Sequence, residues 1–186
     1  TGLAFCAAHP EVVYAVVEAE KSVLLRSENG GRRFEVVNDS PSANPRPFYY
    51  ADIRVDPRQP NRVYSLATQL RVSTDGGKTF ENVRGTGRQT VHVDHHALWI
   101  DPKEPRRMLL GNDGGMYKST DGGASWTNYT ASNGSGISGD FVTALAEQRH
   151  DGKSIIWAAT WKAEGAEEDY GVSITQNNGL TWRVIM

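Results

Sequence analysis

The sequence is poor in cysteine, in net charge and in long apolar runs, and each shortage argues against a class of protein. Cys6 is the single cysteine of the 186-residue chain, so no disulfide forms within it, and its apolar neighbours favour a buried thiol. The 20 basic and 22 acidic side chains leave a net charge of −2, which gives no electrostatic footprint for nucleic acid. The mean hydropathy is −0.52, and no apolar stretch approaches the ~20 residues of a membrane-spanning helix.

Glycine, by contrast, is abundant, and its most regular occurrence is the stretch Ser119–Trp126. The same pattern recurs at 73–80 and, in weaker form, at 27–34 and 175–182. Each copy has a hydroxyl residue, then Asp or Asn two positions later, Gly two further on and an aromatic residue three beyond. The Asp or Asn side chain can accept hydrogen bonds from its own turn, and the Gly can adopt a positive φ. Each copy therefore predicts a tight hairpin whose aromatic residue enters the core.

The four copies follow a period, because their hydroxyl residues are spaced by 46, 46 and 56 positions. A second motif keeps the same order, as His9-Pro10, Asp56-Pro57 and Asp101-Pro102. Two motifs on one period indicate a repeat array.

Each repeat is predicted to contain four short antiparallel strands, which is the composition of a β-propeller blade. The segments are rich in β-branched and aromatic residues and are bounded by turn residues, so we expect an all-β chain with almost no helix. Residues 143–148 are the one place where helix propensity competes. The four blades of this single propeller region are expected at about 1–40, 48–86, 95–131 and 140–186.

These motifs resemble a known superfamily. Ser-x-Asp-x-Gly-x-Thr-Trp is the Asp-box of the BNR repeat, and the stretches 46–57, 92–102 and 111–123 are similar to its sortilin/VPS10-like branch. The resemblance covers all four repeats, although the fourth repeat differs. Its box has Asn177 in place of Asp, and the repeat lacks the Asp-Pro turn. Such propellers usually have more than four blades, and the chain begins with Thr1 rather than Met. We therefore expect an open arc cut from a larger propeller, with a closed four-blade ring as the alternative.

Strand alternation sorts the loops onto two faces. The Asp-boxes and the Asp-Pro turns follow the third and first strands, so they share one face, which we interpret as scaffold. The opposite face holds the loops between blades and the second turns, including the long turn 161–170, and is the predicted binding face. Its candidate ligand-binding residues are Arg46, Tyr49, Tyr50, His92, Asp94, His95, His96 and Asp113.

The sharpest candidate on this face is the stretch from His92 to His96. If it is a strand, His92, Asp94 and His96 point to one side and His95 to the other. Three interpretations stay open: a polar entrance to the strand, a ligand-binding group, and a metal site with Asp113 as the extra ligand. We expect no metal or other cofactor, because zinc sites usually draw on several segments and each Asp-box supplies at most one carboxylate for calcium.

Glycoside hydrolysis would need two carboxyl groups about 5–9.5 Å apart. Asp94 and Asp113 are the weak catalytic candidates, with Asp52 and the acidic residues of 164–169 also on this face. No recognisable catalytic motif pairs them, and Phe48, Tyr49 and Tyr50 either stack sugar rings or pack between blades.

The family resemblance implies a secreted propeller, extracellular or periplasmic, that acts as a binding module for a protein, peptide or glycan. The alternative is a glycoside hydrolase that uses carboxylates on the predicted binding face. The remainder of a parent propeller is a further expected partner.

Overall fold

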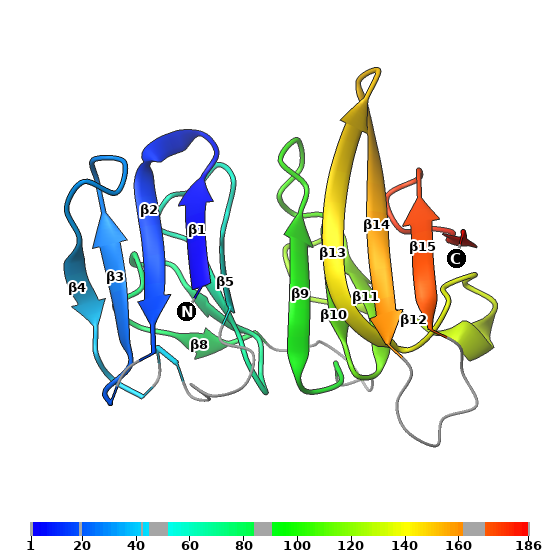
Figure 1. The fold of residues 1–186 in the computed structure, drawn as a ribbon, viewed down its shortest axis with the longest axis horizontal. Coiled ribbons are helices and arrows are strands. Elements are labelled where there is room, and N and C mark those ends of the chain that lie inside the picture. The colour runs from blue at the N-terminus through cyan, green and yellow to red at the C-terminus, as the bar shows by residue number, and fades with distance from the viewer. Residues whose placement is uncertain are drawn as a thin grey trace. The chain divides into compact units, whose positions relative to one another are not determined.

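The computed structural model describes residues 2–18, 20–41, 43–44, 52–83, 91–161 and 170–185. Within these ranges the chain forms four four-stranded antiparallel sheets, and its one helical segment is a short 3-10 turn, η1 (Ala131–Asn133) (Figure 1). The predicted all-β chain of four-stranded antiparallel units is thereby confirmed. The chain divides into two compact units, Thr1–Val83 with Ile100–Pro105, and Arg84–Trp99 with Arg106–Met186.

The first unit contains two sheets, each with its strands in sequence order. The first sheet consists of β1 (Gly2–Cys6), β2 (His9–Val17), β3 (Val23–Ser27) and β4 (Glu35–Asn38). The second consists of β5 (Asp52–Val55), β6 (Val63–Leu66), β7 (Arg71–Ser73) and β8 (Glu81–Asn82). They share a core that includes Tyr14, Leu24 and Ile53, and Cys6 is buried in it as predicted.

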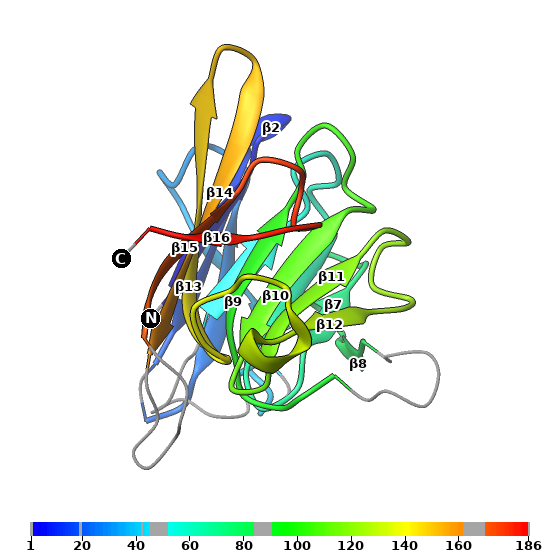
Figure 2. The same cartoon turned by 90° about the vertical axis from the view of Figure 1, so that its right-hand side faces the viewer.

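The second unit carries the other two sheets. The third sheet consists of β9 (His95–Ile100), β10 (Met108–Asn112), β11 (Gly115–Ser119) and β12 (Thr127–Tyr129). The fourth consists of β13 (Phe141–His150), β14 (Lys153–Trp161), β15 (Gly171–Thr175) and β16 (Arg183–Val184). Helix propensity within 143–148 loses to the nine cross-strand pairs of the long β13–β14 hairpin, which rises above its neighbours in Figure 2.

The four Asp-boxes form the hairpins that the sequence predicts. In the box at 119–126, Ser119 Oγ accepts hydrogen bonds from the backbone of Asp121 and Gly123 at 3.3 and 2.9 Å, and Asp121 Oδ1 accepts one from Ser125 N at 2.9 Å. The copy at 73–80 repeats this pattern, and the weaker copies use Asn29 and Asn177 in the role of Asp. Each carboxylate or amide is thus used inside its own turn.

In two of the boxes, the glycine at the fifth position also sets how closely two sheets approach. Gly77 has a φ of +89°, and a Cβ on it would lie 2.5 Å from Leu24 Cδ2 of the preceding sheet. Gly179 has a φ of +77°, and its Cβ would lie 2.7 Å from Leu109 Cδ2. Because the Leu methyl groups occupy the space that a side chain would need, the box acts as an intersheet contact as well as a turn.

The aromatic residues of the third and fourth Asp-boxes, Trp126 and Trp182, are buried as predicted. Trp99 is buried too, and with Trp182 it joins the core of the second unit, which includes Leu109, Met116 and Ile156. Trp157 is half-buried, and its Nε1 donates a hydrogen bond of 3.1 Å to Gln148 Oε1. The placement of blade boundaries and the closure of the arc stay predictions.

Candidate functional site

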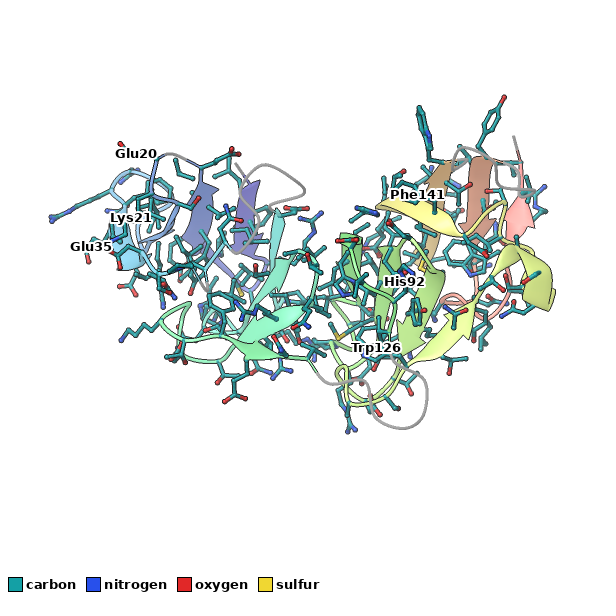
Figure 3. The ribbon with its side chains drawn as sticks, turned by 90° about the horizontal axis from the view of Figure 1, so that it is seen from below. Glu20, Lys21, Glu35, His92, Trp126 and Phe141 are labelled. Carbon is teal, nitrogen blue, oxygen red and sulfur yellow. The ribbon has the colours of Figure 1, made fainter. Side chains whose placement is uncertain are left out.

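The candidate residues that the structure describes gather at one end of the third sheet. β9 begins at His95, and β10 ends at Asn112, immediately before Asp113. In Figure 1, β9 and β13 both begin at the lower end of the second unit, where β14 ends. Figure 3 looks at this end and labels His92 and Phe141 there. Arg46, Tyr49, Tyr50 and Phe48 lie outside the described residues, as do the acidic residues of 164–169.

The predicted grouping of His92, Asp94 and His96 by strand alternation is wrong. Strand β9 starts only at His95, and Asp94 has a φ of 60° in the left-handed region, so the two-residue alternation does not extend back to His92. His92 is exposed, and its Nδ1 lies 3.0 Å from the carbonyl of Val93. The stretch before β9 is a turn rather than an extension of the strand.

Asn112 holds this turn in place. Its side chain is fully buried, and its Nδ2 donates a hydrogen bond of 2.9 Å to the carbonyl of His92. Its Oδ1 accepts one of the same length from Gly114 N, and Tyr117 Oη accepts one of 3.2 Å from His92 N. Gly114 fits because a Cβ there would lie 2.5 Å from the His92 Cβ. Sequence reasoning missed Asn112, although it lies within the Gly-Asn-Asp-Gly-Gly stretch used to establish the family resemblance.

His95 is a buried neutral imidazole, with 3% of its surface exposed. Burial lowers the pKa of His95 from 6.5 to about 4, and the neighbouring His96 adds to the effect. Its Nδ1 lies 3.4 Å from Asn112 Nδ2, which makes Nδ1 the acceptor and assigns the ring proton to Nε2. The His95 side chain is thus buried against the Asn112 amide that holds the turn.

Among the described residues of the predicted set, the structure brings the side chains of His96 and Asp113 into direct contact. His96 Nε2 donates a hydrogen bond to Asp113 Oδ1, and the imidazole is fully buried. The Asp113 side chain keeps 27% of its surface exposed. The His96 ring also packs on Phe141 of β13, with 5.0 Å between ring centroids. A carboxylate that orients a buried imidazole and still reaches solvent can accept a hydrogen bond from a bound hydroxyl group.

The other expected groups are arranged differently. Asp52 lies in the first unit and forms an ion pair of 2.6 Å with Arg54, so its carboxylate already has a partner. Among the residues that the structure describes, no group of three or more His, Cys, Asp or Glu side chains is placed to hold a metal ion. The described part of the chain also contains no helix that is long and apolar enough to cross a membrane.

Comparison with known proteins gives the family. A profile of Sortilin-Vps10, described as "Sortilin, neurotensin receptor 3", matches residues 68–186. The chain belongs to the Sortilin-Vps10 family. The Asp-box resemblance is therefore confirmed.

One sequence relative and two solved structures are similar to this Sortilin-Vps10 chain. A probable oligoxyloglucan-reducing end-specific xyloglucanase of Neosartorya fischeri is 28% identical over 151 residues, which cover 72% of this chain and 17% of that protein. The crystal structure of a GH74 enzyme of Niastella koreensis matches 100% of this chain with 24% of its own, at a TM-score of 0.66 and 17% identity. YCF48 bound to D1 peptide matches 98% of this chain with 53% of its own, at a TM-score of 0.58 and 13% identity.

The structural likeness establishes the fold, which is that of a β-propeller. The chain spans less than a third of the length of the xyloglucanase and of the GH74 enzyme. It therefore corresponds to a segment of those larger propeller proteins.

Proposed function

We propose that this Sortilin-Vps10 chain contributes a glycan-binding surface to a propeller, at the end of the third sheet where His96 meets Asp113. One observation carries the proposal: Asp113 holds a fully buried imidazole and keeps 27% of its own side chain in water. The buried partner fixes the carboxylate before any ligand arrives, so binding would cost little further ordering. A fixed acceptor of this kind suits the hydroxyl groups of a sugar.

Similarity supports the ligand class. The relative from Neosartorya fischeri is named for action on oligoxyloglucan, a chain of β-linked glucose with xylose branches. Branched β-linked gluco-oligosaccharides are therefore the first ligands to test. The proposal keeps His92 and Asp94 as further contacts of this ligand and His95 as the buried support of the turn. Arg46, Tyr49 and Tyr50, which belong to the first unit, stay predicted ligand-binding residues of that unit.

Glycoside hydrolysis is the second candidate, favoured by the xyloglucanase relative. It would use Asp94 and Asp113 of this chain, or one of them with a carboxylate from elsewhere in the parent propeller. A hydrolase needs two carboxyl groups at the scissile bond, about 5–9.5 Å apart. Binding without turnover needs only one of them as an acceptor. Peptide binding is a third candidate, favoured by the likeness to YCF48 bound to D1 peptide.

The test is calorimetric titration of the intact protein with β-linked gluco-oligosaccharides, with and without xylose branches, together with a reducing-sugar assay. The variant Asp113→Asn should weaken binding about tenfold or more, because a hydrogen bond to a charged group contributes about 1.5–3 kcal/mol. Asp151→Asn is the matched control, since Asp151 is exposed and lies at the far end of the β13–β14 hairpin. Turnover that is lost in Asp113→Asn or Asp94→Asn would favour the hydrolase, and a wild-type protein that bound no oligosaccharide would overturn the proposal.

The proposal includes an extracellular or periplasmic location, on the strength of the family resemblance alone. Separation of a culture into medium, osmotic-shock fluid and cytoplasm would test it, because an extracellular protein would be in the medium and a periplasmic one in the shock fluid, whereas recovery in the cytoplasm alone would contradict the location.

A further inference from the structure

Two aromatic side chains stand in water at the end of the second unit where His96 and Asp113 lie. Trp161 ends β14 and is 67% exposed, and Tyr170 immediately precedes β15 and is 70% exposed. They are the two most exposed aromatic side chains among the residues that the structure describes. Aromatic rings of this size usually bury ~150–250 Å² each, so a pair left in water at one place is a feature to be explained.

Strand register predicts that the two rings lie side by side. In the β14–β15 pair, Thr160 and Gly171 are the last residues that pair, and the same register continued by one residue would set Trp161 opposite Tyr170, which directly precedes β15. In the β13–β14 pair, Phe141 lies opposite Trp161. Residues directly opposite in antiparallel strands point to the same side of the sheet, with Cβ atoms about 4.5–5.5 Å apart. Phe141, Trp161 and Tyr170 thus form a row across three strands.

The row is continuous with the polar pair of the candidate site. The Phe141 ring packs 5.0 Å from the ring of His96, and His96 is held by Asp113. Polar groups with hydrogen-bonding capacity therefore lie at one end of the row and exposed aromatic faces at the other. Figure 3 looks onto this end of the unit and labels Phe141 within it.

The composition of the row fits a sugar better than another protein sheet. At three glycines where two sheets of this chain meet, the contacts are with aliphatic side chains: Leu24 on Gly77, Leu109 on Gly179 and Val142 on Gly111. The exposed pair differs, because Trp and Tyr present flat faces with a polar tip. A pyranose ring has an apolar face of C–H groups that packs on such a surface, and hydroxyl groups at its rim that need acceptors.

We infer that Trp161 and Tyr170 form a stacking platform for a pyranose ring of a β-linked oligosaccharide whose neighbouring residues reach Asp113. The inference rests on the proposed glycan-binding function and assigns to it two residues of the fourth sheet. The sugar ring lies on the aromatic faces, and water is released from both apolar surfaces.

The test compares Trp161→Ala and Tyr170→Ala with the wild type, using the same branched and unbranched gluco-oligosaccharides as probes. Each alanine variant should bind about tenfold more weakly, with an unchanged melting temperature, and Trp161→Phe should retain most of the affinity. Leu180→Ala is the matched control, because Leu180 is 58% exposed in the fourth Asp-box, beyond the opposite end of β15. The oligosaccharide should also change the tryptophan emission of the wild type, and that change should be absent in Trp161→Phe.

The outcomes separate the inference from the function on which it rests. A wild-type protein that binds none of the oligosaccharides overturns both. Binding that is lost in Asp113→Asn but unchanged in Trp161→Ala and Tyr170→Ala overturns the platform and leaves the proposed function standing. A lowered melting temperature with unchanged affinity identifies Trp161 and Tyr170 as a protein-packing surface. A loss of affinity in Leu180→Ala equal to that in the two aromatic variants also rejects the platform.

Discussion

The side-chain amide of Asn112 donates a hydrogen bond of 2.9 Å to the carbonyl of His92, twenty positions earlier in the chain. Through this contact the last residue of β10 holds the turn that precedes β9. Asp94 keeps its left-handed conformation within that turn. The pair of His96 and Asp113 follows, with His96 in β9 and Asp113 directly after β10. The geometry of the candidate site therefore depends on Asn112, whose side chain is fully buried.

Replacing Asn112 should destabilise the protein and loosen the site. In Asn112→Ala, the carbonyl of His92 and the amide of Gly114 each lose a partner, and a buried group left unsatisfied costs about 1–3 kcal/mol. Urea unfolding should report a loss of this size. Asn178→Gly is the control, because Asn178 has a φ of 57° that glycine adopts freely, and it should change the unfolding free energy by less than about 0.5 kcal/mol. An equal effect in the two variants would contradict the role given to Asn112.

The burial of His95 predicts a dependence of stability on pH. The pKa of His95 is about 4 in the folded protein and 6.5 in the unfolded chain, so the unfolded chain binds the extra proton between these values. The contribution of neutral His95 to the free energy of unfolding is complete above pH 6.5. It is lost as the pH falls from 6.5 to about 4, by up to about 1.4 kcal/mol per pH unit. Below pH 4 both states are protonated and the loss ends.

Three other ionisable side chains, His92, Asp94 and His96, act electrostatically on the His95 ring, so the measurement is a difference between two proteins. The unfolding free energy of the wild type and of His95→Gln should be followed from pH 4 to 7.5. The wild type should lose more stability than the variant over the acid half of this range. His150→Gln, at an exposed histidine that ends β13, should follow the wild-type curve. Parallel curves for wild type and His95→Gln would show that His95 does not titrate as described.

The contrast between the Asp-boxes and the histidine stretch explains how far the sequence could predict this protein. A box is predictable because its hydroxyl, carboxylate and glycine lie within eight residues and bond to one another. The turn at Asp94 is not, because its conformation depends on Asn112 and Tyr117, which follow it in the chain by 18 and 23 positions. Pattern reasoning extended the strand back to His92 and so grouped the wrong side chains.

The exposed aromatic pair illustrates a second limit. The sequence placed Trp161 in a long second turn on the predicted binding face, and the structure places it at the end of β14 on the end of the unit where His96 lies. That Trp161 should lie opposite Tyr170 follows from the pairing of β14 with β15, a strand that begins only at Gly171. Register of this kind is set by the full sheet and cannot be read from either segment alone.

Gly77, in the second Asp-box, should tolerate alanine far worse than Gly30, in the first. Gly77→Ala brings a Cβ to 2.5 Å from Leu24 Cδ2 and also imposes a φ of +89°, whereas Gly30→Ala imposes a similar φ of +70° in open space. Both variants thus share the backbone strain, and only Gly77→Ala adds a steric clash. Overpacking costs about 1–3 kcal/mol, so the two variants should differ by that amount in thermal or urea unfolding. Equal destabilisation would mean that Leu24 moves aside at no cost.

The carboxylate of an Asp-box should act as a hydrogen-bond acceptor rather than as a charge. Burial raises the pKa of Asp121, but hydrogen bonds from Ser125 and Ser119 outweigh it and bring the pKa to about 2, so the group is ionised throughout the neutral range. The first and fourth boxes nevertheless make the same backbone contacts with Asn29 and Asn177, at 2.9 and 3.0 Å. An amide oxygen is therefore sufficient for the turn.

Asp121→Asn should accordingly cost less than about 0.5 kcal/mol at pH 7, while Asp121→Ala should cost about 0.5–2 kcal/mol, the range for losing a side-chain acceptor that caps backbone N–H groups. Because the folded pKa of Asp121 lies below its ordinary value, the stability of the wild type relative to Asp121→Asn should fall as the pH drops through about 4 toward 2. Urea unfolding at pH 7 and at pH 3 measures both effects. If Asp121→Asn were as damaging as Asp121→Ala at pH 7, the charge itself would be required, and the equivalence of the four boxes would have to be given up.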